Sequence, residues 1–185
     1  MITNTELEYK GDLFPSQITG FQKDGDSVFF TTNNNVILKL TVLRDSLVRF
    51  RYTTKGYFSK DFSYAIDKTQ SHGYNFLEVT ELKEVYQIKT SKIICSISKV
   101  DMRVAITDLE GNCILEDELG FHWEESYQFG GNIVKMSKAS RDGESYYGLG
   151  DKASHLNLKG KRVENWATDQ YAFHKDQEPL YKVVP

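Results

Sequence analysis

The sequence has little of what marks several large protein classes. Its 185 residues include only two cysteines and three prolines. No stretch approaches the roughly 18 consecutive apolar residues of a membrane-spanning helix. No cluster of Lys and Arg forms the basic stripe typical of nucleic-acid-binding proteins, and the formal net charge is −3. We therefore expect neither a membrane nor a nucleic acid as a partner.

The N-terminus lacks the features of a secretory signal. Met1–Glu6 contains no basic segment and no apolar segment. This favours the cytoplasm, and a periplasmic location stays open because a signal peptide can have been removed. Cys95 lies in the apolar run Lys92–Ile97, which predicts a small buried side chain in a reducing compartment. A disulfide with Cys113 is the alternative.

Motifs for metals and cofactors are also missing. The four histidines are widely spread, and the acidic stretch Glu116–Glu125 lacks the spacing of a calcium loop. Gly148–Ala153 fits the loose dinucleotide pattern G-x-G-x-x-A, but residues 154–160 do not form the amphipathic helix that such a site requires. We expect no metal and no cofactor.

What the chain does contain is alternation with a period of two. Apolar and polar residues alternate in the runs Val36–Val42, Leu47–Tyr52 and Met102–Thr107. Successive side chains of a strand point to opposite faces, so each run has one apolar face. Aromatic residues, which favour strands, make up 13% of the chain. The pattern is typical of antiparallel sheets packed on one side.

Turn residues separate these runs at short intervals. They form the segments Lys23–Asp26, Asn33–Asn35, Leu109–Asn112 and Arg141–Glu144. Asp142-Gly143 predicts a hairpin, because the central residues of a type I′ turn need positive φ. Many short strands with such turns predict an all-β fold, an antiparallel β-sandwich with no helix longer than about two turns.

The character of the sequence changes after about Ser145. Residues 146–185 lose the alternation and are rich in Gly, Asn, Asp, Trp and Tyr. Their aromatic content argues against disorder, and loops of this length are usually functional. We predict a sandwich domain over 1–145 and an ordered functional loop over 146–185. The final apolar run, Tyr181–Pro185, suggests that the natural protein continues.

Four short motifs stand in this last segment. They are Tyr-Gly-Leu-Gly-Asp-Lys at 147–152, Leu-Asn-Leu-Lys-Gly-Lys-Arg at 156–162, Trp-Ala-Thr-Asp-Gln-Tyr at 166–171, and Glu-Pro-Leu-Tyr-Lys at 178–182, followed by Val184-Pro185. In type, order and spacing they resemble the family 31 glycoside hydrolases, where Asp is common in place of Glu178 and Ile in place of Val184. The upstream strands resemble, more loosely, the galactose-mutarotase-like N-terminal sandwich of that family.

The resemblance implies a retaining α-glycosidase. Its two catalytic carboxyl groups would lie on a (β/α)₈ barrel downstream of Pro185, so we expect no catalytic residue in this chain and no activity from it alone. An α-glucosidase is the first expectation and an α-xylosidase the second, and α-galactosidases, lyases and transferases also occur in the family. The expected partners are the barrel of the same polypeptide and an α-linked oligosaccharide.

The resemblance also implies substrate-binding residues. Asp169 would accept hydrogen bonds from sugar hydroxyls, with Thr168 beside it, and Trp166 and Tyr171 would offer apolar faces to the sugar or to the barrel. Lys161 and its neighbour Arg162 could pair with the barrel. The alternatives are that these side chains only hold the loop in place, or that the chain is a stand-alone carbohydrate-binding sandwich.

Overall fold

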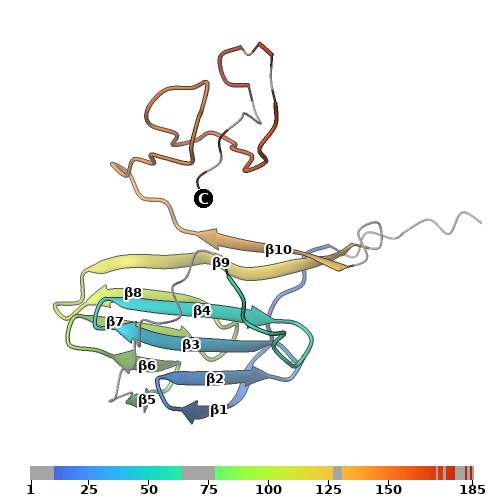
Figure 1. The fold of residues 1–185 in the computed structure, drawn as a ribbon. Helices are drawn as coiled ribbons and strands as arrows, with labels where there is room; N and C mark the ends of the chain where they lie inside the picture. Colours follow the sequence, from blue (N-terminus) through green and yellow to red (C-terminus); the bar gives the residue numbers. More distant parts are fainter. Residues whose placement is uncertain are drawn as a thin grey trace, which may run out of the picture. The chain divides into compact units, whose positions relative to one another are not determined.

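The computed structural model describes residues 11–63, 78–126, 131–169, 171–172, 174–177, 182 and 184. The chain forms two compact units, Met1–Ala139 and Ser140–Pro185. All strands of the described residues lie in the first unit, and no helix occurs among those residues (Figure 1). The predicted all-β fold is confirmed.

The first sheet has four antiparallel strands in chain order. They are β1 (Ile18–Asp24), β2 (Ser27–Thr32), β3 (Ile37–Arg44) and β4 (Leu47–Thr53). Two predicted turns join β1 to β2 and β2 to β3, with Gly25 in the first at φ +57° and Asn35 in the second at φ +62°. Both are residue types that tolerate a left-handed backbone, so these turns are encoded locally.

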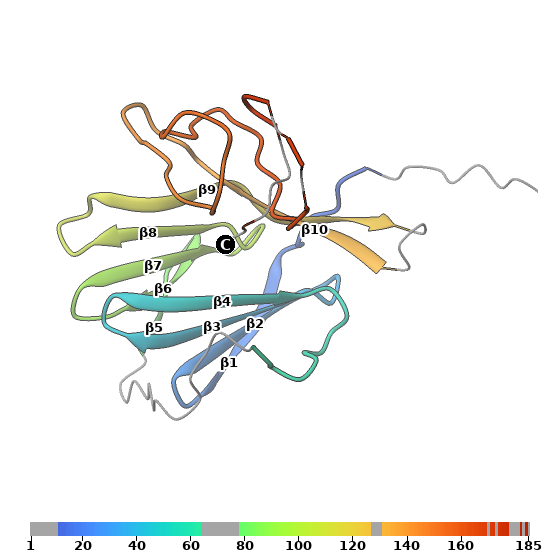
Figure 2. The same ribbon diagram turned by 45° about the horizontal axis from the view of Figure 1, so that its top comes forward.

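The second sheet has six antiparallel strands. They are β5 (Val79–Glu81), β6 (Val85–Lys89), β7 (Ile93–Ser98), β8 (Val104–Asp108), β9 (Cys113–Ser126) and β10 (Gly131–Lys138), in the order β10-β9-β8-β7-β6-β5. Figure 2 shows the two sheets as two layers. The sheets have unequal numbers of strands, and β4 and β10 are edge strands of their respective sheets.

The core lies between these layers. In the run 36–42 the alternate residues are fully buried, as the alternation predicted; they are Val36, Leu38, Leu40 and Val42. They meet side chains of the other sheet such as Ile88 and Ile97. At about 1.5–3 kcal/mol for each large side chain removed from water, this burial is the main stabilising term of the unit.

Cys95 belongs to this core. It is fully buried, and it forms no disulfide with Cys113, so the disulfide alternative is wrong. Burial raises the pKa of the Cys95 thiol to about 12, because the thiolate would lose its hydration. The side chain therefore acts as a small hydrophobic residue.

A bulge interrupts the pairing of β9 with β10. Ser137 pairs with Gly120, whereas Lys138 pairs with Asp117. The Asp117 carboxylate is fully buried there, accepting a hydrogen bond from the Val104 amide at 2.8 Å and pairing with the Lys138 ammonium at 2.5 Å. Gly120 has φ +68°, and a Cβ on it would lie 3.0 Å from the Asp117 carboxylate, so this position requires glycine.

Two local predictions are wrong. The turn at Asp142-Gly143 forms, with Gly143 at φ +84°, but no strand follows it among the described residues of 140–177, so there is no hairpin. The chain beyond the turn bonds to the side chain of Asn157 in place of a strand partner. Met102 does not belong to a strand either; it is a buried residue at φ +59° in the connection between β7 and β8, and β8 begins at Val104.

Candidate functional site: the motif-bearing unit and a cavity of the sandwich

Hydrogen bonds from side chains to the backbone organise the unit Ser140–Pro185. The Asn157 carbonyl oxygen accepts from the amides of Tyr146 and Lys159, each at 3.0 Å, and its amide group donates to the Ser145 hydroxyl at 3.1 Å. Next to it the Leu158 amide donates to the Tyr146 carbonyl at 2.7 Å, and the Leu158 side chain is only 6% exposed. The Leu-Asn motif thus folds back onto the start of the unit.

The second glycine of the Tyr-Gly-Leu-Gly motif has a steric role. Gly150 has φ +86°, and a Cβ there would lie 2.3 Å from the Lys182 carbonyl oxygen. The neighbouring Asp151 amide donates to that same oxygen at 3.1 Å. By contrast Gly148, at φ +99°, has nothing within 4 Å of an added Cβ. Gly150 therefore permits the C-terminal segment to approach the motif, and Gly148 serves only the turn.

Asp176 is a second organising residue, which sequence reasoning missed. Its carboxylate accepts from the Ser154 hydroxyl at 2.6 Å and from the Lys161 ammonium at 3.0 Å. The Ser154 hydrogen bond, followed by Lys161, holds the pKa of the Asp176 carboxyl below its usual value. Lys161, for which the sequence offered a barrel partner, thus has a partner inside the unit. No motif spacing links residues 154, 161 and 176, so only the fold reveals the cluster.

The four predicted substrate-binding residues lie on one exposed segment of this unit. Trp166 is 69% exposed, Tyr171 is fully exposed, Asp169 is exposed and Thr168 is half-buried. Within the part of the chain that the structure describes, no hydrogen bond or ion pair reaches these side chains. Their proposed roles stay predictions, and Leu180, Tyr181 and Val183 lie outside the described residues.

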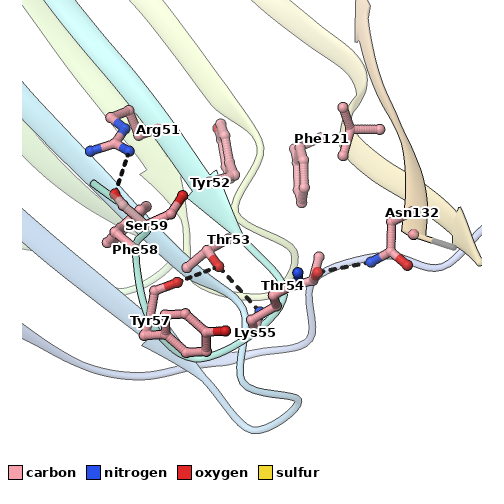
Figure 3. A pocket seen from close by; sticks show the side chains of 12 residues that line it. Arg51, Tyr52, Thr53, Thr54, Lys55, Tyr57, Phe58, Ser59, Phe121 and Asn132 are labelled. Atoms are coloured by element: carbon pink, nitrogen blue, oxygen red, sulfur yellow. Dashed lines mark hydrogen bonds between the residues drawn. The ribbon is translucent and has the colours of Figure 1, made fainter. Parts of the chain in front are cut away.

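The first unit contains a cavity that no sequence motif indicated. It has a volume of about 430 Å³. Its lining comes from the end of β4, the loop after β4, β9 and β10 (Figure 3). The residues are Arg51, Tyr52, Thr53, Thr54, Lys55, Tyr57, Phe58, Ser59, Phe121, Gly131, Asn132 and Val134. These segments are far apart in the sequence and belong to different sheets, so the packing of the two sheets brings them together.

No group of three or more His, Cys, Asp or Glu side chains in the described part of the chain is arranged to hold a metal ion. A search of the same residues for helices long and apolar enough to cross a membrane finds none.

Comparison with known proteins decides the family. Residues 37–185 match the family described as the glycosyl hydrolase 31 N-terminal galactose mutarotase-like domain. The chain belongs to this family. The match includes β3 to β10 and the whole second unit, so these strands and the C-terminal motifs are parts of one family signature.

Individual relatives agree with this assignment. The chain is 26% identical over 151 residues to alpha-glucosidase 2 of Bacillus thermoamyloliquefaciens, which covers 80% of this chain and 18% of that protein. Its fold matches the GH31 dextranase of Flavobacterium johnsoniae solved with isomaltotriose, with a TM-score of 0.82, 24% identity, and coverage of 94% of this chain and 21% of that one.

A third relative is the GH31 alpha-xylosidase of Xanthomonas citri. It has a TM-score of 0.65 and 26% identity over 76% of this chain and 16% of its own length. The family 31 chain described here therefore spans about a fifth or less of the length of these enzymes. By its family model it is the N-terminal galactose mutarotase-like domain of a glycosyl hydrolase 31 protein.

Proposed function

We propose that this chain is the N-terminal domain of a retaining α-glycosidase, and that residues 146–185 lead into a catalytic barrel and contribute to its substrate-binding rim. Residues 1–145 would form the supporting sandwich. Membership of the family supports the proposal, and so does the small share of each relative that the chain covers. The relatives named above are an α-glucosidase, a dextranase and an α-xylosidase, so an α-linked oligosaccharide is the proposed substrate class.

The observation that carries the loop's role is the exposure of its aromatic residues. Trp166 and Tyr171 present large apolar surfaces to water, and backbone hydrogen bonds hold the chain on either side of them, at Lys161 and at Gln177. Exposed aromatic side chains gathered on one segment mark interaction sites. Asp169 lies between them in sequence, and its carboxylate makes no hydrogen bond or ion pair with the described residues. A carboxylate can accept charge-assisted hydrogen bonds from sugar hydroxyls, which are roughly twice as strong as neutral ones.

The first test is the coding sequence beyond Pro185. We expect the reading frame to continue for several hundred codons and to encode an alternation of strands and helices. A stop codon shortly after Pro185 would contradict the proposal. The purified 185-residue chain should hydrolyse no α-glucoside, since both carboxyl groups of a retaining glycosidase would be absent.

The second test is Asp169→Ala in the whole enzyme. We expect kcat/KM for an α-linked disaccharide to fall about 10-fold, which corresponds to about 1.4 kcal/mol of lost transition-state stabilisation. Glu164→Ala is the matched control, because Glu164 is also exposed in the same unit. Unchanged kinetics for both variants would mean that the loop does not contact the substrate.

A further inference from the structure

The cavity of the sandwich lies beside β10 and the end of β4 (Figure 3). On β10, Asn132 and Val134 share one face of the strand, because successive side chains alternate. Val134 pairs in register with Trp123, whose side chain belongs to the core, so this is the inner face of the sheet. Val134 is nevertheless exposed. The inner face of β10 is thus left open and forms one wall of the cavity.

The loop after β4 forms the opposite wall, and its conformation is fixed. The Thr53 hydroxyl donates to the Tyr57 carbonyl at 2.7 Å and accepts from the Lys55 amide at 3.2 Å. Gly56, at φ +73°, provides the turn between them. From β10, the Asn132 amide group donates to the Thr54 hydroxyl at 2.9 Å. These bonds join the two walls, so a ligand would meet a site that is already formed.

The remaining lining combines aromatic rings with neutral polar groups. Tyr52 and Phe121 stack with ring centroids 4.4 Å apart and close one end. Burial, and then the nearby Asp117 carboxylate, raises the pKa of the Tyr52 hydroxyl, which therefore stays neutral. The Tyr57 ring is 64% exposed. Of the polar side-chain atoms, the amide oxygen of the Asn132 side chain makes no hydrogen bond within the described part of the chain.

The charges of the lining are few. No carboxylate lines the cavity among the described residues. The Arg51 guanidinium lies over the Phe58 ring, 5.0 Å from its centroid, and 3.4 Å from the Asp61 carboxylate, which it shares with Arg49, so its charge is partly compensated. Lys55 is the remaining cation. The site therefore suits a ligand that is apolar on one face and carries neutral hydroxyl groups.

We propose that this cavity is a saccharide-binding site of the sandwich. A pyranose ring has an apolar C–H face that can pack on Tyr57, and hydroxyl groups that can bond to Asn132, Thr54 and Lys55. The volume of about 430 Å³ falls within the roughly 300–1,000 Å³ range of small-molecule sites. The ligand class is a neutral oligosaccharide, and the choice of an α-linked glucan as probe rests on the proposed function.

The test is an NMR titration of the 185-residue chain with isomaltotriose, following backbone amide shifts. We expect the largest shifts at residues 53–59 and 131–134. Tyr57→Ala should weaken binding about fivefold to tenfold, whereas Tyr57→Phe, which keeps the ring, should bind within twofold of the wild type. Tyr147→Ala is the matched control, because Tyr147 is 61% exposed in the other unit and lines no part of the cavity.

Two outcomes would overturn the inference. The first is that the wild type does not bind isomaltotriose, or that Tyr57→Ala binds it with the same affinity as the wild type. The second is an affinity for isomaltotriose that falls steeply with salt, because a neutral sugar held by hydrogen bonds and ring contacts should bind almost independently of salt. Trp166→Ala separates this inference from the proposed function: if it abolishes binding while Tyr57→Ala does not, the cavity fails and the loop's substrate contact is supported.

Discussion

Each of the two units of the chain is stabilised by a different kind of interaction. Met1–Ala139 has a continuous core of apolar side chains from two sheets. In Ser140–Pro185, Leu158 is the one buried hydrophobic residue among those described. The order there comes from Asn157, Asp176 and other side chains that bond to the backbone or to one another.

This difference predicts different stabilities. Burying one large apolar side chain contributes about 1.5–3 kcal/mol, whereas a hydrogen bond contributes about 0.5–1.5 kcal/mol net. The second unit should therefore open more readily than the sandwich. Its exposed Trp166 and Tyr171 leave apolar surface that a neighbouring catalytic domain would cover under the proposed function.

The largest effect is expected in the core. Phe30 is fully buried, so Phe30→Ala should lower the free energy of unfolding by about 3–5 kcal/mol through lost burial and a cavity. Urea unfolding followed by fluorescence measures this. Leu156→Ala, at a side chain that is 83% exposed, should change the free energy by less than about 0.5 kcal/mol. Equal effects of the two variants would contradict the comparison.

The next effect concerns the bulge of β9. Asp117→Ala removes the acceptor of the Val104 amide and the partner of Lys138, so we expect a loss of about 2–3 kcal/mol. The loss is below that of a fully buried ion pair because Lys138 is partly solvated. Glu118→Ala, at an exposed position of the same strand, is the control for the same unfolding measurement. A stability unchanged by Asp117→Ala would show that water replaces the carboxylate.

Within the second unit, Gly150→Ala should act locally. The added Cβ would collide with the Lys182 carbonyl, so we expect faster hydrogen exchange of the Asp151 amide and unchanged unfolding of the sandwich. Gly148→Ala is the control, because it adds only the positive-φ cost of about 1–2 kcal/mol without a collision. If both variants exchange alike, the approach of Lys182 does not depend on the glycine.

The smallest effect is the pH dependence of the same unit. The folded-state pKa of Asp176 lies below its unfolded value of about 3.9, so its contribution to stability is present above that pH and is lost as the pH falls through the folded pKa. A carboxyl ¹³C titration should give a midpoint below that of free aspartate. Ser154→Ala should raise this midpoint, since the Ser154 hydrogen bond is the largest cause of the shift. If neither Ser154→Ala nor Lys161→Met moved the midpoint, these two side chains would not lower the pKa of Asp176, and the cluster would not stabilise this unit.

The sequence by itself determined the sandwich and the family. Alternation over 36–42 and 47–52 specified the faces that pack on the core, and Gly25 and Asn35 specified turns, because side-chain direction and positive φ are local properties. The motifs of residues 147–182 pointed to the family whose signature the chain matches. The roles of Trp166, Thr168, Asp169 and Tyr171 stay predictions.

Only the tertiary structure decided which distant residues meet. Asp142-Gly143 carries a hairpin signal, but a hairpin needs a second strand, and the chain beyond it bonds to Asn157. The partner of Lys161 and the carbonyl that faces Gly150 lie far along the chain, at Asp176 and Lys182. The cavity likewise lies between the loop after β4 and the inner face of β10, which belong to different sheets. The packing of one sheet on the other decides that these segments meet, and no local pattern of residues predicts it.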